Sequence, residues 1–308
     1  MKHSAAILIM AFFFFGHKAS GTDAGPGTLT RVTLASSETG ISRNIDIWLP
    51  DDYDTTRKYS VIYMHDGQML FDSTTTWNRQ EWSADEAVSG LMSGNAIKPC
   101  IIVGVWNRDK YRYTEYFPEK ALNYLSKRKQ ARMIRKAMMG RAQGDSYLRY
   151  LVNDVKPYID ANFSTLTDNE NTIVMGSSMG GLISLYAICE YPGVFGGAGC
   201  LSTHLPMKGV NFLARNDNCV ARAFRKYLSE KLPDPARHRI YFDYGTETLD
   251  RWYEPYQEKV DALIEKAGYI SGENWKTMRF EGDDHSEKSW SRRLDIPLKF
   301  LLGPDPVK

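Results

Sequence analysis

The most informative stretch of the chain reads Asn171-Thr-Ile-Val-Met-Gly-Ser-Ser-Met-Gly-Gly181. A short apolar run ends in Gly-x-Ser-x-Gly, with Ser178 at its centre, and a second apolar run follows from Leu182. This order is typical of a nucleophile elbow, a tight strand-to-helix turn that holds a serine in an exposed, strained conformation. Gly176 and Gly180 fit the pattern because a β-carbon at either position would collide with the neighbouring strand or helix. We therefore expect Ser178 to be a nucleophile.

The segments around this elbow alternate between two periodicities. Strands are expected at residues 30–35, 43–49, 59–64, 100–106, 172–175, 197–201, 239–244 and 276–280. Helical patterns lie between them, at residues 84–91, 146–163, 181–190, 221–231 and 252–267. This alternation predicts an α/β fold with a mostly parallel sheet, helices on both faces and an N-terminal antiparallel hairpin. No linker or repeat divides residues 21–308, which we interpret as a single domain.

A serine nucleophile needs a general base, and the histidines can be screened by their position. His285 follows the last expected strand, in Phe280-Glu-Gly-Asp-Asp-His-Ser-Glu287. This gives the order serine, acid, histidine that accompanies an elbow on this type of sheet. Imidazole suits the role because it titrates near neutrality. The remaining histidines lie in the leader, too early in the chain or before a strand: His3, His17, His65, His204 and His238.

The acid should lie in the loop after the strand at 239–244, which reads Gly245-Thr-Glu-Thr-Leu-Asp250. We favour Asp250, because a short carboxylate fixed at a helix start would orient the imidazole well. Asp250 could instead be only the N-cap of the following helix, a common role for aspartate. Glu247 is the alternative acid, or else a solvated loop carboxylate.

An oxyanion hole needs two N–H donors. The backbone N–H of Met179, directly after the nucleophile, is one candidate. The second is expected from the turn His65-Asp-Gly-Gln68, where Gly67 would let the backbone approach the substrate and Gln68 would donate. Since His65 and His204 also follow strands at this edge of the sheet, we expect them to bind substrate. A metal site could be built only from His204, Asp283 and His285, and no ligand spacing supports one.

Composition is that of an ordinary globular protein, with 308 residues, 43% of them apolar and 25% charged. Lys2 and His3 precede an apolar run at residues 5–15, and small residues follow, which predicts a secretory signal peptide at residues 1–20. An uncleaved membrane anchor is the alternative. Cleavage would leave equal numbers of basic and acidic residues, because the leader removes Lys2 and Lys18. We therefore expect an exported protein, periplasmic or secreted, with no nucleic-acid partner and no stable membrane insertion.

The four cysteines allow disulfides if the protein is exported. Cys100, Cys189 and Cys200 lie in apolar runs, where a free thiol behaves as a small hydrophobe. Cys219 lies in a polar loop and is the cysteine most expected to be bridged.

Four motifs together resemble the putative-esterase family of α/β-hydrolases, which is similar to esterase D. They are His65-Asp-Gly-Gln-x-Leu-Phe71, Ile101-Ile-Val-Gly-Val-Trp-Asn107 with Glu115-Tyr-Phe-Pro118, the elbow, and Tyr191-Pro-x-Val-Phe195. The resemblance covers residues 43–302 and includes feruloyl, acetyl-xylan and siderophore esterases and mycolyltransferases. It implies the α/β-hydrolase fold and a cofactor-free Ser-His-acid mechanism through Ser178 and His285. The acid loop departs from the common Gly-x-x-Asp/Glu spacing, since Thr248 occupies that place.

The resemblance implies a serine esterase that acts on a small-molecule or glycan ester, with a carbohydrate-linked acyl or feruloyl ester as the favoured substrate. A siderophore (catecholate ester) esterase and an acyltransferase with the same triad are the alternatives. The oligomeric state stays open.

Residues 118–145 stand apart because they are strongly basic. Eight lysines and arginines occur in this segment before Asp145, against the single acid Glu119. The segment could be a lid that places positive charge over the pocket. Alternatively, it is a solvated helix face with its apolar residues packed inward.

Overall fold

The computed structural model describes residues 25–208 and 217–304, so the predicted signal peptide lies outside the described residues. One eight-stranded sheet runs through the molecule in the order β1-β2-β4-β3-β5-β6-β7-β8. Its strands are β1 (Thr28–Ala35), β2 (Ser42–Leu49), β3 (Ser60–His65), β4 (Cys100–Val105), β5 (Thr172–Ser177), β6 (Gly197–Leu201), β7 (Arg239–Gly245) and β8 (Trp275–Phe280).

The first two strands form the antiparallel hairpin expected from the sequence. β1 pairs with β2 and β2 pairs with β4 in antiparallel fashion, whereas β4, β3, β5, β6, β7 and β8 are parallel neighbours. The predicted fold class is therefore confirmed. Because the parallel strands all end at one edge of the sheet, the loops that follow them meet there.

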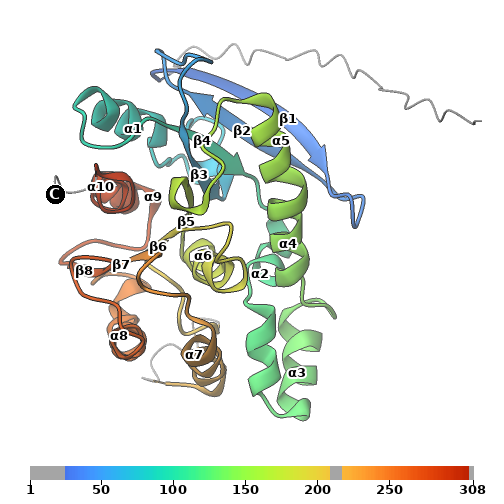
Figure 1. Cartoon of the computed structure of the whole chain (residues 1–308). Coiled ribbons are helices and arrows are strands. Elements are labelled where there is room, and N and C mark those ends of the chain that lie inside the picture. Colours follow the sequence, from blue (N-terminus) through green and yellow to red (C-terminus); the bar gives the residue numbers. More distant parts are fainter. Residues whose placement is uncertain (1–24, 209–216, 305–308) are drawn as a thin grey trace, which may run out of the picture.

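Helices cover both faces of the sheet (Figure 1). They are α1 (Ala84–Ser93), α2 (Arg112–Glu115), α3 (Lys127–Ala137), α4 (Gly144–Tyr150), α5 (Lys156–Asn162), α6 (Met179–Glu190), α7 (Cys219–Lys231), α8 (Glu254–Lys266), α9 (Glu287–Arg293) and α10 (Asp295–Leu302). A π-helical segment at Leu151–Val155 joins α4 to α5, so the helix expected at 146–163 is one continuous helical run with a π turn inside it.

Successive side chains of each strand point to opposite faces of the sheet, so the sheet lies between two apolar cores. In β3, Val61 and Tyr63 belong to one core, together with residues of α4 to α8, whereas Ile62 and Met64 belong to the other, with α1, α9 and α10. All six residues of β3 are buried. A strand buried on both faces is typical of a parallel sheet between two helical layers.

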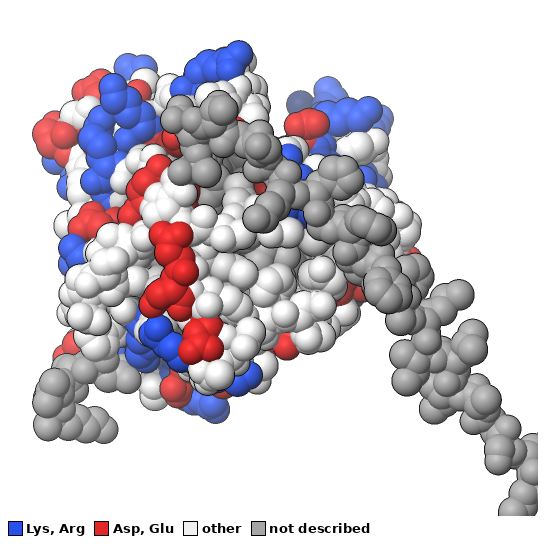
Figure 2. Space-filling model, turned by 90° about the horizontal axis from the view of Figure 1, so that it is seen from above, with Lys and Arg blue, Asp and Glu red and all other residues white. Residues whose placement is uncertain are grey.

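The surface carries both signs of charge. On the face shown in Figure 2, basic and acidic side chains are interspersed and much of the surface is uncharged. None of the helices in the described ranges combines the length and apolar character that crossing a membrane requires.

All four cysteines are free thiols, so the expectation that Cys219 is bridged was wrong. It lies instead in the first turn of α7.

Candidate active site

Ser178 lies at the sharp turn between β5 and α6, as the elbow pattern predicts. Its backbone has φ 57° and ψ −117°, a conformation that residues other than glycine rarely adopt. The turn is held by two backbone hydrogen bonds, from Ser178 N–H to the Leu201 carbonyl (2.9 Å) and from His204 N–H to the Ser178 carbonyl (3.0 Å). A β-carbon on Gly176 would lie 2.9 Å from the carbonyl carbon of Gly180, so the first glycine of the motif is required by space.

The structure pairs His285 with Asp250. His285 lies in the loop between β8 and α9, and its Nδ1 is 2.5 Å from Oδ1 of Asp250, which is fully buried at the start of a 3₁₀ turn. Glu247 is exposed, whereas Asp250 is the carboxylate that contacts the histidine. Thr248, at the position where the loop departs from the family spacing, accepts a hydrogen bond from the His285 backbone N–H (2.8 Å). The loop therefore fixes both the ring and the backbone of His285.

Asp250 accepts hydrogen bonds from two further groups. Its Oδ2 accepts hydrogen bonds from the Gly245 N–H (2.7 Å) and from the Ser202 hydroxyl (2.5 Å). The His285 ring donates the third, from Nδ1. Three donors therefore converge on the two oxygens of this carboxylate. With its Nδ1 proton directed at Asp250, the imidazole leaves Nε2 free to accept a proton.

Ser178 and His285 open onto the same cleft of about 610 Å³. Between these two described residues no hydrogen bond joins the Ser178 hydroxyl to the imidazole; in enzymes without substrate this contact is often long. The cleft is lined by Asp66, Gln68, Met69, Trp77, Asn78, Gln80, Trp82, Asn107, Asp109, Arg112, Ser177, Ser178, His285, Ser286, Glu287 and Trp290.

The two candidate oxyanion donors lie on adjoining turns. Met179 is the first residue of α6, where a backbone N–H has no partner within the helix. Gln68 lies in the turn after β3 and lines the cleft. The turns touch at Gly180, where a β-carbon would lie 3.4 Å from the β-carbon of His65. Gly67 packs so closely on β4 that a β-carbon there would lie 2.4 Å from the carbonyl carbon of Gly104.

His65 lies beneath the cleft and not in its lining. Its side chain is 1% exposed, and Nδ1 is 2.7 Å from the Tyr147 hydroxyl. Burial lowers the pKa of His65 to about 3, so the ring is neutral. The neighbouring Asp66 does line the cleft, where Arg112 contacts both of its oxygens (2.8 and 2.7 Å). Burial acts to raise the pKa of Asp66, but the opposing interactions, of which those with Arg112 are the largest, lower the pKa below its ordinary value.

His204 also faces protein and is absent from the cleft lining. Its Nε2 is 3.0 Å from the Lys208 carbonyl, which can only accept, so Nε2 carries the proton. Burial and the nearby His285 lower the pKa of His204 to about 4, which leaves Nδ1 as an acceptor for the Tyr253 hydroxyl (2.8 Å). The Tyr253 ring in turn stands edge-on to His285, with 5.7 Å between ring centroids. His204 therefore supports the site from behind.

The basic segment and the metal site considered from the sequence do not form part of the cleft in the described structure. None of the residues that line it comes from 118–145, so the structure does not place this basic segment over the cleft as a lid. Within residues 25–208 and 217–304, no group of three or more His, Cys, Asp or Glu side chains is placed to hold a metal ion. Trp77, Arg112 and Trp290 line the cleft and were not predicted, because no pattern in the sequence marks them as cleft residues.

Two proteins of known sequence are similar to part of this chain. The chain is 26% identical over 194 residues to an endo-1,4-beta-xylanase/feruloyl esterase of Xylanibacter ruminicola, which covers 60% of this chain and 23% of that protein. It is 25% identical over 162 residues to the uncharacterized protein YbbA of Bacillus subtilis, which covers 52% of this chain and 56% of that protein.

Solved structures share the fold at low identity. A ferulic acid esterase superposes with a TM-score of 0.63 at 16% identity, covering 90% of this chain and 99% of its own. An enterobactin esterase from Shigella flexneri superposes with a TM-score of 0.63 at 16% identity, covering 89% of this chain and 58% of its own. The family model described as "Putative esterase" matches residues 36–295. The chain therefore belongs to the putative esterase family.

Proposed function

We propose that the chain is a serine carboxylic-ester hydrolase that works through an acyl-enzyme on Ser178. The observation that carries this proposal is the 2.5 Å contact between His285 and the buried Asp250. His285 and Ser178 line the same cleft. No cofactor enters the proposed reaction. The expected substrate is a carbohydrate-linked acyl or feruloyl ester, which the similarity to feruloyl esterases supports.

In the proposed reaction, Nε2 of His285 takes the proton of the Ser178 hydroxyl while Oγ attacks the ester carbonyl carbon. The N–H groups of Met179 and Gln68 stabilise the negative charge on the carbonyl oxygen. Collapse breaks the bond to the alcohol, which leaves with the proton from His285. Water then attacks the acyl-enzyme by the same route and releases the acid. Asp250 stabilises the imidazolium in each half-reaction.

A siderophore esterase is the second candidate, because an enterobactin esterase shares the fold over 89% of this chain. Its substrate would be a catecholate ester and its triad the same. We further propose that residues 1–20 direct export and are removed, so that the mature enzyme meets its ester outside the cytoplasm.

The test is turnover of aryl acetate, feruloyl, acetyl-xylan and catecholate esters by the mature protein and by Ser178→Ala. Loss of the nucleophile should remove nearly all turnover, on the order of a millionfold if the triad acts as a unit. Ser184→Ala is the matched control, because Ser184 lies on α6, the helix that follows Ser178, and its hydroxyl donates to the Gly180 carbonyl (2.8 Å). Wild-type rates in Ser178→Ala, or activity lost to a chelator and restored by zinc, would contradict the proposal.

A further inference from the structure

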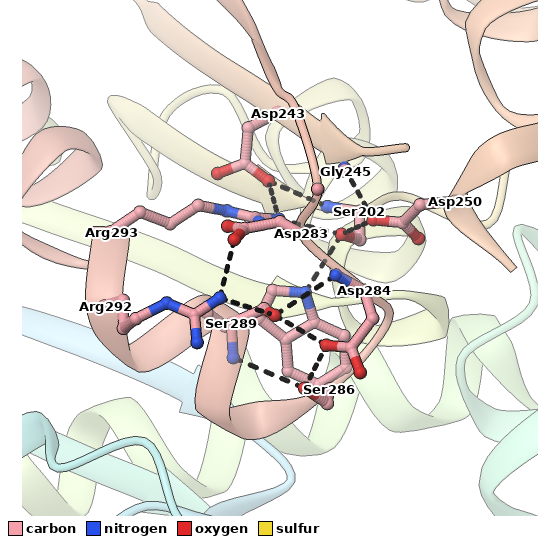
Figure 3. A network of polar contacts seen from close by, with 12 residues as sticks. Ser202, Asp243, Gly245, Asp250, Asp283, Asp284, Ser286, Ser289, Arg292 and Arg293 are labelled. Atoms are coloured by element: carbon pink, nitrogen blue, oxygen red, sulfur yellow. Dashed lines mark hydrogen bonds and ion pairs between the residues drawn. The ribbon is translucent and has the colours of Figure 1, made fainter. Parts of the chain in front are cut away.

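Arg293 is a buried cation at the end of α9, directly behind the proposed triad. Its side chain is 2% exposed and contacts three oxygens, on Asp243 of β7 (2.8 Å), on Asp283 (2.8 Å) and on Ser202 (2.9 Å). Figure 3 shows these groups converging; Ser202 directly follows β6, and Asp283 lies in the loop between β8 and α9. Its neighbour Arg292 also binds Asp283 but is 53% exposed. Two adjacent arginines therefore share one carboxylate, and only Arg293 reaches the interior.

Ser202 connects this cation to the acid of the triad. Its hydroxyl oxygen receives hydrogen bonds from Nη2 of Arg293 (2.9 Å) and from Nε1 of Trp290 (2.9 Å), and both of these groups can only donate. The single proton of Ser202 must therefore go to its third partner, Oδ2 of Asp250 (2.5 Å). Ser202 itself has φ 40°, so its backbone is strained to hold this position.

The cluster is a poor device for stability alone. Oδ2 of Asp243 and Nε of Arg293 are buried without a hydrogen-bond partner in the described structure. Burying charges costs free energy that an imperfectly satisfied ion pair does not fully recover. A fixed cation close to the triad does, however, stabilise an adjacent carboxylate and disfavour an adjacent imidazolium.

We propose that Arg293 is a positioning residue that acts through Ser202 on Asp250 and thereby sets the pH range in which His285 accepts the Ser178 proton. The proposal rests on Ser178, His285 and Asp250 being the triad of the proposed hydrolase. Arg293 touches neither substrate nor the reacting atoms. Other charged or titratable groups near His285 keep their side chains and partners in the test: Asp66, Arg112, His204, Tyr253, Asp284 and Glu287. Asp243 and Asp283 also remain, but both lose an ion-pair partner in the variants that neutralise Arg293.

The sign of the effect follows from charge. Arg293→Met removes positive charge near the imidazole, so the imidazolium persists to higher pH and the rising limb of kcat/KM should move up by about one pH unit. Arg293→Lys keeps the positive charge, so its rising limb should lie close to that of the wild type. Arg292→Met is the matched control; its exposed charge is screened, so the limb should move by less than about 0.3 unit.

Ser202→Ala keeps every charge and removes only the connecting hydroxyl. Losing a hydrogen bond to a charged group should lower kcat by about tenfold with KM nearly unchanged. This variant decides the question if Arg293→Met does not fold, which circular dichroism and thermal melting would reveal.

The measurement is the pH–rate profile of an aryl ester for wild type and the four variants. A limb that moves in Arg293→Met but not in Arg292→Met, together with the fall in kcat for Ser202→Ala, supports the proposal. A folded Arg293→Met with the wild-type profile, an equal shift in Arg292→Met, or full activity in Ser202→Ala overturns it. An inactive wild type would instead refute the proposed function.

Discussion

At the proposed active site, the role of a side chain depends on whether it donates or accepts each of its hydrogen bonds. Asp250 accepts from three donors, so an amide in its place must turn its NH₂ group towards at least one of them. Asp250→Asn should therefore lower turnover by roughly 10²–10⁴ while the fold persists, as loss of a triad carboxylate does. The measurement is kcat on an aryl ester, with circular dichroism to verify folding.

Glu247→Gln is the control for this experiment, since Glu247 is an exposed carboxylate in the same loop. It should cost less than about tenfold in turnover. If Glu247→Gln lost most of its turnover and Asp250→Asn kept nearly wild-type turnover, Glu247 would be the acid of the triad.

Residues of the site differ in how well the sequence predicts them. Ser178 and His285 follow from a local motif and from chain order, and Asp250 was one of two choices that only the fold could separate. Ser202 and Arg293 are 91 positions apart, and no local pattern indicates that they meet. His65 and His204 were expected to bind substrate because they follow strands. Chain order, however, does not reveal which way a side chain points.

At the scale of elements, the turn after β3 depends on contact between two backbones. A β-carbon at Gly67 would overlap the backbone of β4 at Gly104 (2.4 Å), so Gly67→Ala must displace the turn that carries Gln68. Overpacking of this kind should cost about 1–3 kcal/mol of unfolding free energy. Misplacing an oxyanion donor by about 1 Å can lower kcat by roughly a hundredfold. Urea unfolding and kcat on an aryl ester measure the two effects.

Gly90→Ala supplies the comparison from α1. Nothing lies within 4 Å of a β-carbon at Gly90, and alanine is the better helix former. This variant should gain about 0.5–1 kcal/mol and keep full activity. Equal behaviour of the two alanine variants would show that the turn after β3 tolerates movement.

The sheet was predictable because its central strands are apolar runs bounded by turn residues, and all eight strands were expected to within a few residues. The two C-terminal helices were not expected, since α9 is short and polar and only one residue separates it from α10. The basic segment contains the helix α3, which has no fully buried residue. Charge alone could not distinguish a lid from a helix on another side of the molecule.

At the scale of the whole molecule, the packed core holds ionisable groups whose titration is linked to folding. Burial lowers the pKa of His65 to about 3 and is the main cause that lowers the pKa of His204 to about 4. Both values lie below the roughly 6.5 expected for an unfolded chain. Between pH 6.5 and 4 the unfolded chain therefore binds protons that the native protein does not, so each histidine reduces stability as the pH falls. Asp85 acts in the opposite direction, because burial raises its pKa to about 8.

His65→Gln isolates one of these contributions, since glutamine can still bond to the Tyr147 hydroxyl but does not titrate. The unfolding free energy of the wild type should fall relative to this variant by about 1.4 kcal/mol per pH unit between pH 6 and 4.5. Asp85→Asn should give the opposite sign, with the wild type gaining stability relative to the variant as the pH falls from 8 to 5. Urea unfolding at half-unit steps of pH measures both differences. Parallel curves for the wild type and His65→Gln would mean that the buried imidazole is hydrated or protonated in the native protein.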